Sequence, residues 1–113
     1  MRIRIGLLAL ACAVAAGSAD ANSSINNVHI SEIVPNNVGI VRIYIDTPRT
    51  GLPSCAGSTT TALSINANTM AGQALVSALY LAFASNLPID IAGDGACDVE
   101  TGIESVGYAG VHR

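Results

Sequence analysis

The chain has 113 residues, of which half are hydrophobic and only 12% are charged, and its net charge is −3. After residue 21 it contains three arginines, no lysine and seven carboxylates, which is a net charge of −4. Binding to a phosphate backbone or to an anionic lipid surface needs a basic patch. The composition therefore argues against nucleic-acid binding and against adhesion to anionic membranes.

The first 21 residues have the pattern of a secretory signal peptide. Arg2 and Arg4 precede a short apolar run, and the segment ends on the small-x-small sequence Ala19-Asp20-Ala21. The run is shorter than the roughly 20 residues of a membrane-spanning helix. We therefore predict cleavage after Ala21, no membrane span, and one mature domain, residues 22–113, in the periplasm or the extracellular medium.

Two cysteines, Cys55 and Cys97, remain in the mature segment. In an exported protein an even number of cysteines predicts a structural disulfide. The other interpretation is a metal or thiol site, which would need several clustered ligands. No Cys-x-x-Cys spacing exists, and His29 and His112 lie near the two ends, so the disulfide is favoured.

Three strands are predicted before the helix, because β-branched residues dominate these segments, at residues 25–34, 38–46 and 59–65. In the second strand Val41, Ile43 and Ile45 share one face, which we expect in the core. Arg42 and Tyr44 lie on the other face, toward solvent or a contact surface. A loop rich in proline and glycine separates the second strand from the third.

One helix is predicted in the mature segment, over residues 69–85, because alanine and leucine dominate it. An asparagine or a threonine can cap its start, and an asparagine and a proline end it. Its few polar side chains, Gln73, Ser77 and Tyr80, share one narrow stripe. Two interpretations follow: a core helix packed deep into a sheet, or a helix that packs partly on a partner subunit.

Two further strands are predicted after the helix, at residues 87–92 and 103–111, with Gly107 and Gly110 suggesting bulges. The positions expected to point inward are Thr61, Leu63, Ile65, Ile89 and Ile91. The resulting order β-β-β-α-β-β is that of the OB-fold. The predicted fold is therefore mainly β with one helix (α+β), a small five-stranded Greek-key barrel. In it the helix plugs the open end and the disulfide ties the strands on either side of the helix.

A family resemblance follows from four segments: Met70-Ala71-Gly72-Gln73-Ala74-Leu75, Pro88-Ile89-Asp90-Ile91, Gly93-Asp94-Gly95-Ala96-Cys97 and Glu104-Ser105-Val106-Gly107-Tyr108. Over about residues 38–109 the pattern resembles small secreted bacterial proteins of unknown role. Their fold is similar to the B-subunits of AB5-type enterotoxins, including the subtilase-cytotoxin B subunit. The resemblance implies pentamers whose helices line a pore, and binding of cell-surface sugars. No glycan-contacting motif aligns, so no binding residue is transferred.

Candidate chemistry is sparse. His29 or His112 would need a nucleophile and an orienting group for catalysis, and no Gly-x-Ser-x-Gly elbow is present. Five carboxylates crowd into fifteen residues: Asp90, Asp94, Asp98, Glu100 and Glu104. Carboxylates can bind calcium, but the EF-hand spacing is missing, which favours a solvated loop. We predict no catalytic residue, no cofactor and no metal.

The candidate contact surface consists of Arg42, Tyr44, Gln73, Ser77 and Tyr80. Arg42 beside Tyr44 could hold a sugar, although an ordinary side-chain pair on a sheet is the favoured interpretation. We expect a non-enzymatic binding or assembly module that associates with itself or with a glycan or protein partner. The alternatives are a monomeric structural or inhibitor-type envelope protein and, third, a small hydrolase.

Overall fold

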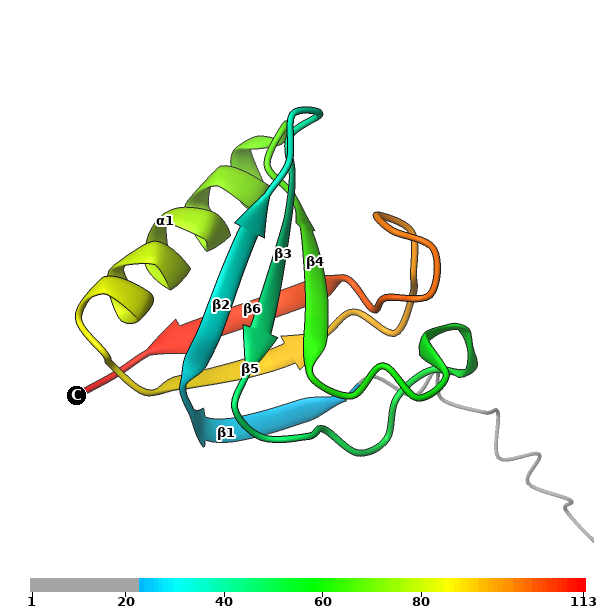
Figure 1. The fold of residues 1–113 in the computed structure, drawn as a ribbon, viewed down its shortest axis with the longest axis horizontal. Helices are drawn as coiled ribbons and strands as arrows, with labels where there is room; N and C mark the ends of the chain where they lie inside the picture. Colours follow the sequence, from blue (N-terminus) through cyan, green and yellow to red (C-terminus); the bar gives the residue numbers. More distant parts are fainter. Residues whose placement is uncertain (1–22) are drawn as a thin grey trace, which may run out of the picture.

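The computed structural model describes residues 23–113, and the predicted signal peptide lies outside the described residues (Figure 1). The elements in chain order are β1 (Ser24–Val28), β2 (Ile30–Pro35), β3 (Ile40–Ile45), the short 3-10 helix η1 (Ser54–Ala56), β4 (Ala62–Asn66), α1 (Met70–Ala84), β5 (Ile89–Gly93) and β6 (Val106–Val111). The strands form two antiparallel sheets with the orders β1-β5-β6 and β2-β3-β4. The prediction of a mainly β protein with one α-helix is confirmed. The predicted five-stranded barrel is not what residues 23–113 form, because they contain six strands in two sheets.

The sixth strand arises because the predicted strand over residues 25–34 is divided at His29. Asn27 has a φ of 55°, and the pairing of β1 with β5 changes register between Ile25 and Val28. A left-handed residue inside a strand produces a bulge and a bend. The His29 carbonyl accepts a hydrogen bond from the Asp46 amide at 3.0 Å. The chain therefore turns a corner here, and each half pairs in a different sheet.

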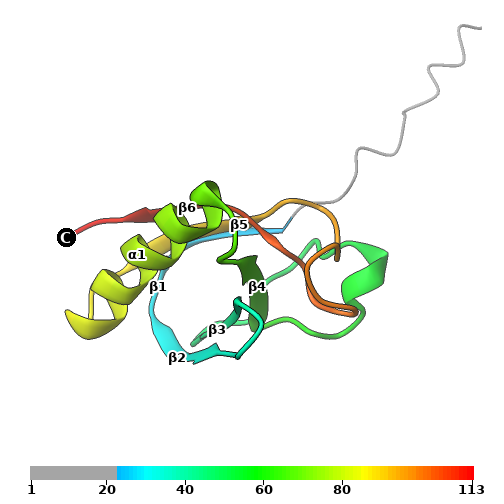
Figure 2. The ribbon, with the colours of Figure 1, turned by 90° about the horizontal axis from the view of Figure 1, so that it is seen from above.

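A second junction between the sheets lies at the start of β6. Ser64 and Ser105 form an isolated parallel bridge, and the Ser64 amide donates to the Glu104 carbonyl at 3.1 Å. Helix α1 packs against β2, β4 and β6 (Figures 1 and 2). Between β4 and β6 the two sheets are joined by this isolated bridge and not by a continuous ladder. Helix α1 covers this side of the molecule.

The core lies between the inner faces of the two sheets and α1. Its best-buried members have no solvent exposure, as predicted for them: Ile43, Leu63, Ile89 and Ile91. Ala62 and Ser64 of β4 are buried as well, at 3% and 0% exposure, while Thr61 is only half-buried. Simple alternation fails in β4 because the loop before β6 covers its outer face, where Ser64 donates to Glu100 at 2.6 Å.

Helix α1 begins where the Thr69 hydroxyl accepts the Gly72 amide at 2.9 Å, which confirms one of the predicted caps. Asn86, with a φ of 51°, follows its C-terminal end. Only Gly72, Leu79 and Ala82 are buried in this helix. The interpretation of a helix packed deep in the core is therefore wrong, because one narrow face meets the sheets and the opposite face is exposed.

Candidate functional site

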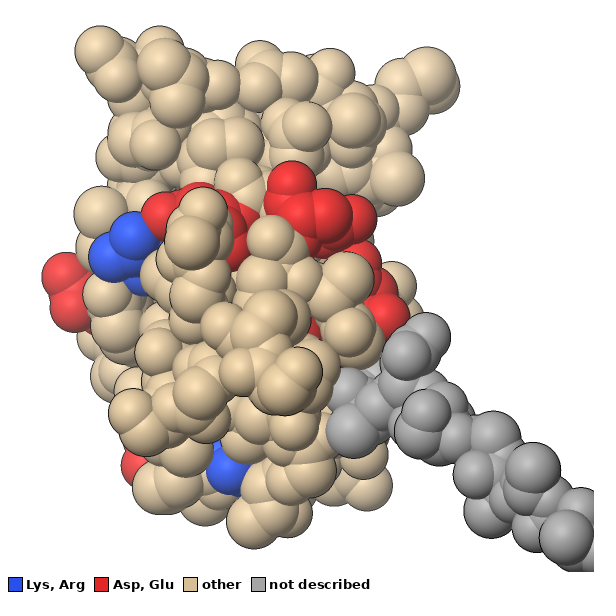
Figure 3. All heavy atoms as spheres, turned by 90° about the vertical axis from the view of Figure 1, so that its right-hand side faces the viewer, with Lys and Arg blue, Asp and Glu red and all other residues tan. Residues whose placement is uncertain are grey.

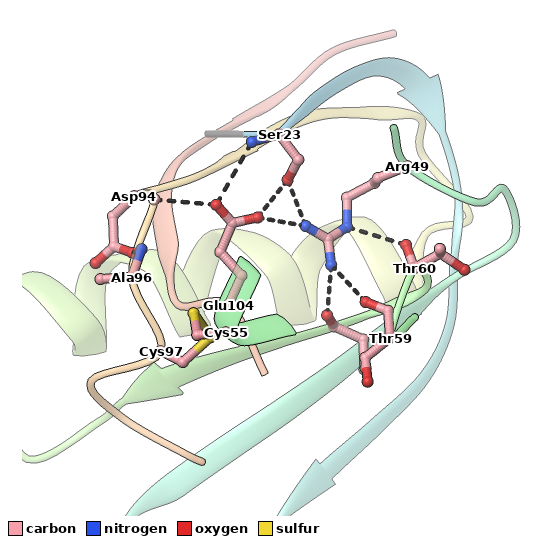
Figure 4. A network of polar contacts seen from close by, with 11 residues as sticks. Ser23, Arg49, Cys55, Thr59, Thr60, Asp94, Ala96, Cys97 and Glu104 are labelled. Atoms are coloured by element: carbon pink, nitrogen blue, oxygen red, sulfur yellow. Dashed lines mark hydrogen bonds and ion pairs between the residues drawn. A yellow bond between two sulfur atoms is a disulfide. The ribbon is translucent and has the colours of Figure 1, made fainter. Parts of the chain in front are cut away.

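A buried ion pair joins the two long loops of the protein (Figure 4). Arg49 lies in the loop between β3 and β4, and Glu104 lies just before β6. Arg49 donates to Glu104 Oε1 at 2.7 Å, and both side chains have no solvent exposure. Ser23, at the start of the described chain, donates from its hydroxyl to the same carboxylate.

Every charged atom of this pair has further partners. Glu104 Oε2 accepts the backbone amides of Ser23 and Gly95 at 3.4 and 3.0 Å. The Arg49 guanidinium donates to three carbonyls, those of Thr59, Thr60 and Ala62. Burial lowers the pKa of Arg49, and the Glu104 carboxylate partly offsets this effect. Full satisfaction of the hydrogen bonds is what makes such a pair tolerable inside a protein.

The disulfide holds the same two loops together. Cys55 lies in η1 and Cys97 in the loop between β5 and β6, with their Cα atoms 6.1 Å apart. The predicted pairing is confirmed, and it closes a sequence separation of 42 residues. In the chain-entropy model such a loop stabilises the fold by about 4 kcal/mol. The ion pair and the disulfide together link the loop between β3 and β4 to the loop between β5 and β6, and we name this junction the loop base.

The predicted contact residues on β3 are occupied by an intramolecular contact. Arg42 donates to Glu100 Oε2 at 2.5 Å and to the Tyr44 hydroxyl at 3.2 Å. Glu100 holds the pKa of Arg42 above its usual value, and Arg42 in turn lowers the pKa of Glu100. Glu100 also accepts the Ser64 hydroxyl. This cluster fastens the loop before β6 onto the outer face of β3 and β4.

The other three predicted contact residues lie on α1. The Gln73 side chain donates to the Ala67 carbonyl at 3.2 Å, and Ser77 donates to the Gln73 carbonyl at 2.8 Å. Tyr80 is 41% exposed and borders a small apolar recess beside Ile33. The five predicted contact residues therefore lie on two elements. Arg42 and Tyr44 of β3 point away from the core, whereas α1 packs against that core.

Each histidine contacts an aspartate. His112 Nε2 lies 3.1 Å from Asp90 Oδ1, and His29 Nδ1 lies 3.8 Å from Asp46 Oδ2. Both contacts are exposed. Catalysis would need a nucleophile next to the imidazole, and the polar contacts given above for the two rings are with aspartates.

The carboxylates before β6 do not form a uniformly solvated loop, which corrects the predicted interpretation. Glu104 is buried and Glu100 is paired with Arg42, as described above. Asp94 and Asp98 remain exposed, beside a recess of about 160 Å³ that reaches the first turn of α1. Carboxylates gather in a band across this face (Figure 3). Within residues 23–113 no group of three or more His, Cys, Asp or Glu side chains is arranged to hold a metal.

A larger hollow lies next to this recess, and the two share Ala71 and Leu75 of α1. A shallow groove of about 420 Å³ runs between α1 and β6, with walls formed by small residues, one leucine and one tyrosine: Ala71, Ala74, Leu75, Ala78, Gly107, Tyr108 and Ala109. Neither α1 nor β6 contains a charged residue. Large apolar side chains are exposed around it, with Met70 at 89%, Leu81 at 58% and Tyr108 at 57%. This uncharged surface is the strongest candidate site for contact with another molecule.

Two residues central to the structure, Arg49 and Glu104, were not singled out as a pair by sequence reasoning. One signal was available, since Arg49 is one of only three arginines after residue 21 and belongs to a loop with two prolines. Its partner could not be chosen among seven carboxylates without the fold.

None of the helices in residues 23–113 has the length and hydropathy needed to cross a membrane.

Comparison of the chain with protein-family models, with curated proteins and with solved structures finds no match in any of the three.

Proposed function

We propose that the protein is an exported, non-enzymatic binding or assembly module whose contact surface is the outer face of α1. The observation that carries this proposal is the exposure of large apolar side chains on a helix without any charge. A monomeric protein of this size rarely exposes a broad apolar surface unless something binds there.

The disulfide supports export to an oxidising compartment. Cytosolic proteins seldom keep a disulfide, and the Cys55–Cys97 bond is an integral part of the loop base. We propose the periplasm or the extracellular medium as the location, with the signal peptide removed after Ala21. N-terminal sequencing of the exported protein tests the cleavage site, because the first residue should be Asn22.

We propose an opened, OB-like arrangement for the two sheets. If β1 and β2 are counted as one strand bent at His29, the strands follow the order expected of that barrel. The parallel bridge between Ser64 and Ser105 supports a partial closure between β4 and β6. Helix α1 lies across the same opening.

Sedimentation velocity of the exported, oxidised protein tests assembly. We expect a concentration-dependent increase in the sedimentation coefficient between micromolar and millimolar protein, whereas a clean monomer throughout would remove self-assembly from the proposal. In that case a monomeric structural or inhibitor-type envelope protein becomes the better description. A glycan array probed with the same sample tests the sugar-binding form of the proposal.

A further inference from the structure

Helix α1 carries a second, unused packing seam on its exposed face. Five residues follow the spacing 4-3-4-3 and are all exposed; they form what we name the α1 seam: Met70, Ala74, Ser77, Leu81 and Ala84. This spacing keeps side chains in line along one side of a helix and is typical of helices that pack along their length on another helix. The buried residues of α1 lie on the opposite side.

The charge distribution favours a second copy of this chain as the occupant of the seam. The fifteen residues of α1 include no charged side chain, whereas exposed carboxylates occur elsewhere, at Glu32, Asp46, Asp94 and Asp98. Two copies of a net-negative protein repel each other where their carboxylates meet. Contact through α1 brings two neutral surfaces together, and neither copy leaves a charge buried without a partner.

We infer that two copies pair through their α1 seams in antiparallel orientation, an inference that rests on the proposed assembly function. In the register we assign, Met70 faces the second copy's Leu81, and Ala74 faces its Ser77. The small residues at the centre allow the helices to approach closely, while the large residues pack at both ends. The antiparallel orientation also places the opposed ends of the two helix dipoles together.

The exposed apolar area is sufficient for a reversible dimer. Along and beside the seam, Met70, Leu81, Tyr80 and Tyr108 are between 41% and 89% exposed. Taking about 200 Å² for a large side chain in full exposure, these four present on the order of 500 Å² per copy, before the alanines are counted. A standard interface uses about 800 Å² per partner. We therefore expect a dimer that dissociates on dilution.

Sedimentation equilibrium of charge variants locates the interface. Leu81→Glu places a carboxylate in the seam, and we expect it to weaken dimerisation at least about tenfold. Ser58→Glu is the control that adds the same charge, because Ser58 is exposed in the loop between β3 and β4, on the opposite side of the molecule from α1 (Figures 1 and 2). Its dimerisation should equal that of the parent protein. Thermal unfolding of both variants shows that the fold is retained.

Cysteine crosslinking tests the register. When Ala74→Cys and Ser77→Cys variants are mixed and mildly oxidised, antiparallel pairing should give mainly the mixed crosslinked dimer. Crosslinking of each variant with itself in preference to the mixture would overturn the antiparallel arrangement. Assembly of the parent protein that Leu81→Glu leaves unchanged would overturn the α1 interface, including the contact surface proposed above, but not self-assembly as such. A monomer at every concentration would overturn both.

Discussion

Arg49 and Glu104 meet at 2.7 Å in the interior of the protein, where solvent reaches neither side chain. They are 55 residues apart in the sequence. Around them the start of β1, the loop between β3 and β4, and the loop between β5 and β6 converge. Because the disulfide joins the same two loops, we expect this end of the molecule to be the most sensitive to substitution.

Glu104→Gln should strongly destabilise the protein. The change leaves the Arg49 charge buried without its counter-ion. It also replaces one of the two acceptor oxygens with an NH2 group, which faces hydrogen-bond donors on either side of the carboxyl position. Removing one member of a buried pair costs about 3–5 kcal/mol, measurable by urea unfolding. Glu32→Gln, at an exposed position, is the control and should change the free energy of unfolding by less than about 0.5 kcal/mol.

A double-mutant cycle separates the pair from its surroundings. Arg49→Met combined with Glu104→Gln should cost clearly less than the sum of the two single substitutions, because no uncompensated charge remains. Urea unfolding of the four proteins gives the coupling free energy. Additive costs would mean that the two residues stabilise the fold independently.

Gly93→Ala should destabilise the fold through the same carboxylate. A Cβ atom at position 93 would overlap the carboxyl group of Glu104, so the ion pair would have to move. We expect a cost of about 1–3 kcal/mol, typical of overpacking. Gly110→Ala is the matched control on the neighbouring strand, because its Cβ would meet no atom within 4 Å. Equal thermal stability of the two variants would contradict the role we assign to Gly93.

Replacing both Cys55 and Cys97 with serine should lower the free energy of unfolding by up to about 4 kcal/mol. The bond closes a separation of 42 residues, which would otherwise add freedom to the unfolded chain. Unfolding with and without a thiol reductant checks the assignment. The parent protein should lose stability in the reductant, while the double-serine variant should be insensitive to it.

Stability should fall in acid partly through Glu100. The hydrogen bond from Arg42 lowers the pKa of this carboxyl, against an opposing effect of burial. A carboxyl whose pKa is lower in the folded protein contributes stability above its unfolded pKa of about 4.3 and loses it as the pH falls through the folded value. Glu100→Gln should therefore flatten the decline in the free energy of unfolding below about pH 4.5, while Glu32→Gln should leave the slope unchanged.

Asp94 should have the opposite effect. Although the residue is exposed as a whole, partial burial of its carboxyl raises its pKa most, the charges of Asp98 and Glu104 add to this, and the Ala96 amide opposes it. The ionised form is thus disfavoured by folding, and stability is lost as the pH rises through and above the unfolded pKa of about 3.9. Asp94→Asn keeps the acceptor for Ala96 and should be more stable than the parent at pH 7, with the difference shrinking toward pH 3. A loss of stability at pH 7 would contradict this.

Local chemistry in the sequence was sufficient for much of the fold. The β-branched run around Ile43 specified a strand and its buried face. Thr69, one of the candidate caps, and Asn86 marked where the helix begins and ends. These features depend on neighbours only a few residues away. The corner at His29 was missed, because a bulge at Asn27 depends on pairing with β5, which is distant in the sequence.

The candidate site depended more on the tertiary structure. An uncharged helix is compatible with complete burial or with an exposed face, and only the packing of Gly72, Leu79 and Ala82 decided for exposure. In the same way, carboxylates that are neighbours in the sequence differ in environment, since Glu104 is buried against Arg49 and Asp94 is exposed.

The sequence by itself determined the periodicity of the strands, the helix with its caps, and a cysteine pair suited to an oxidising compartment. The tertiary structure decided which arginine meets which carboxylate and which side of α1 remains open. The physical reason is that hydrogen-bonded turns and side-chain alternation act over a few residues. Burial and ion pairing instead depend on segments that only the folded chain brings together.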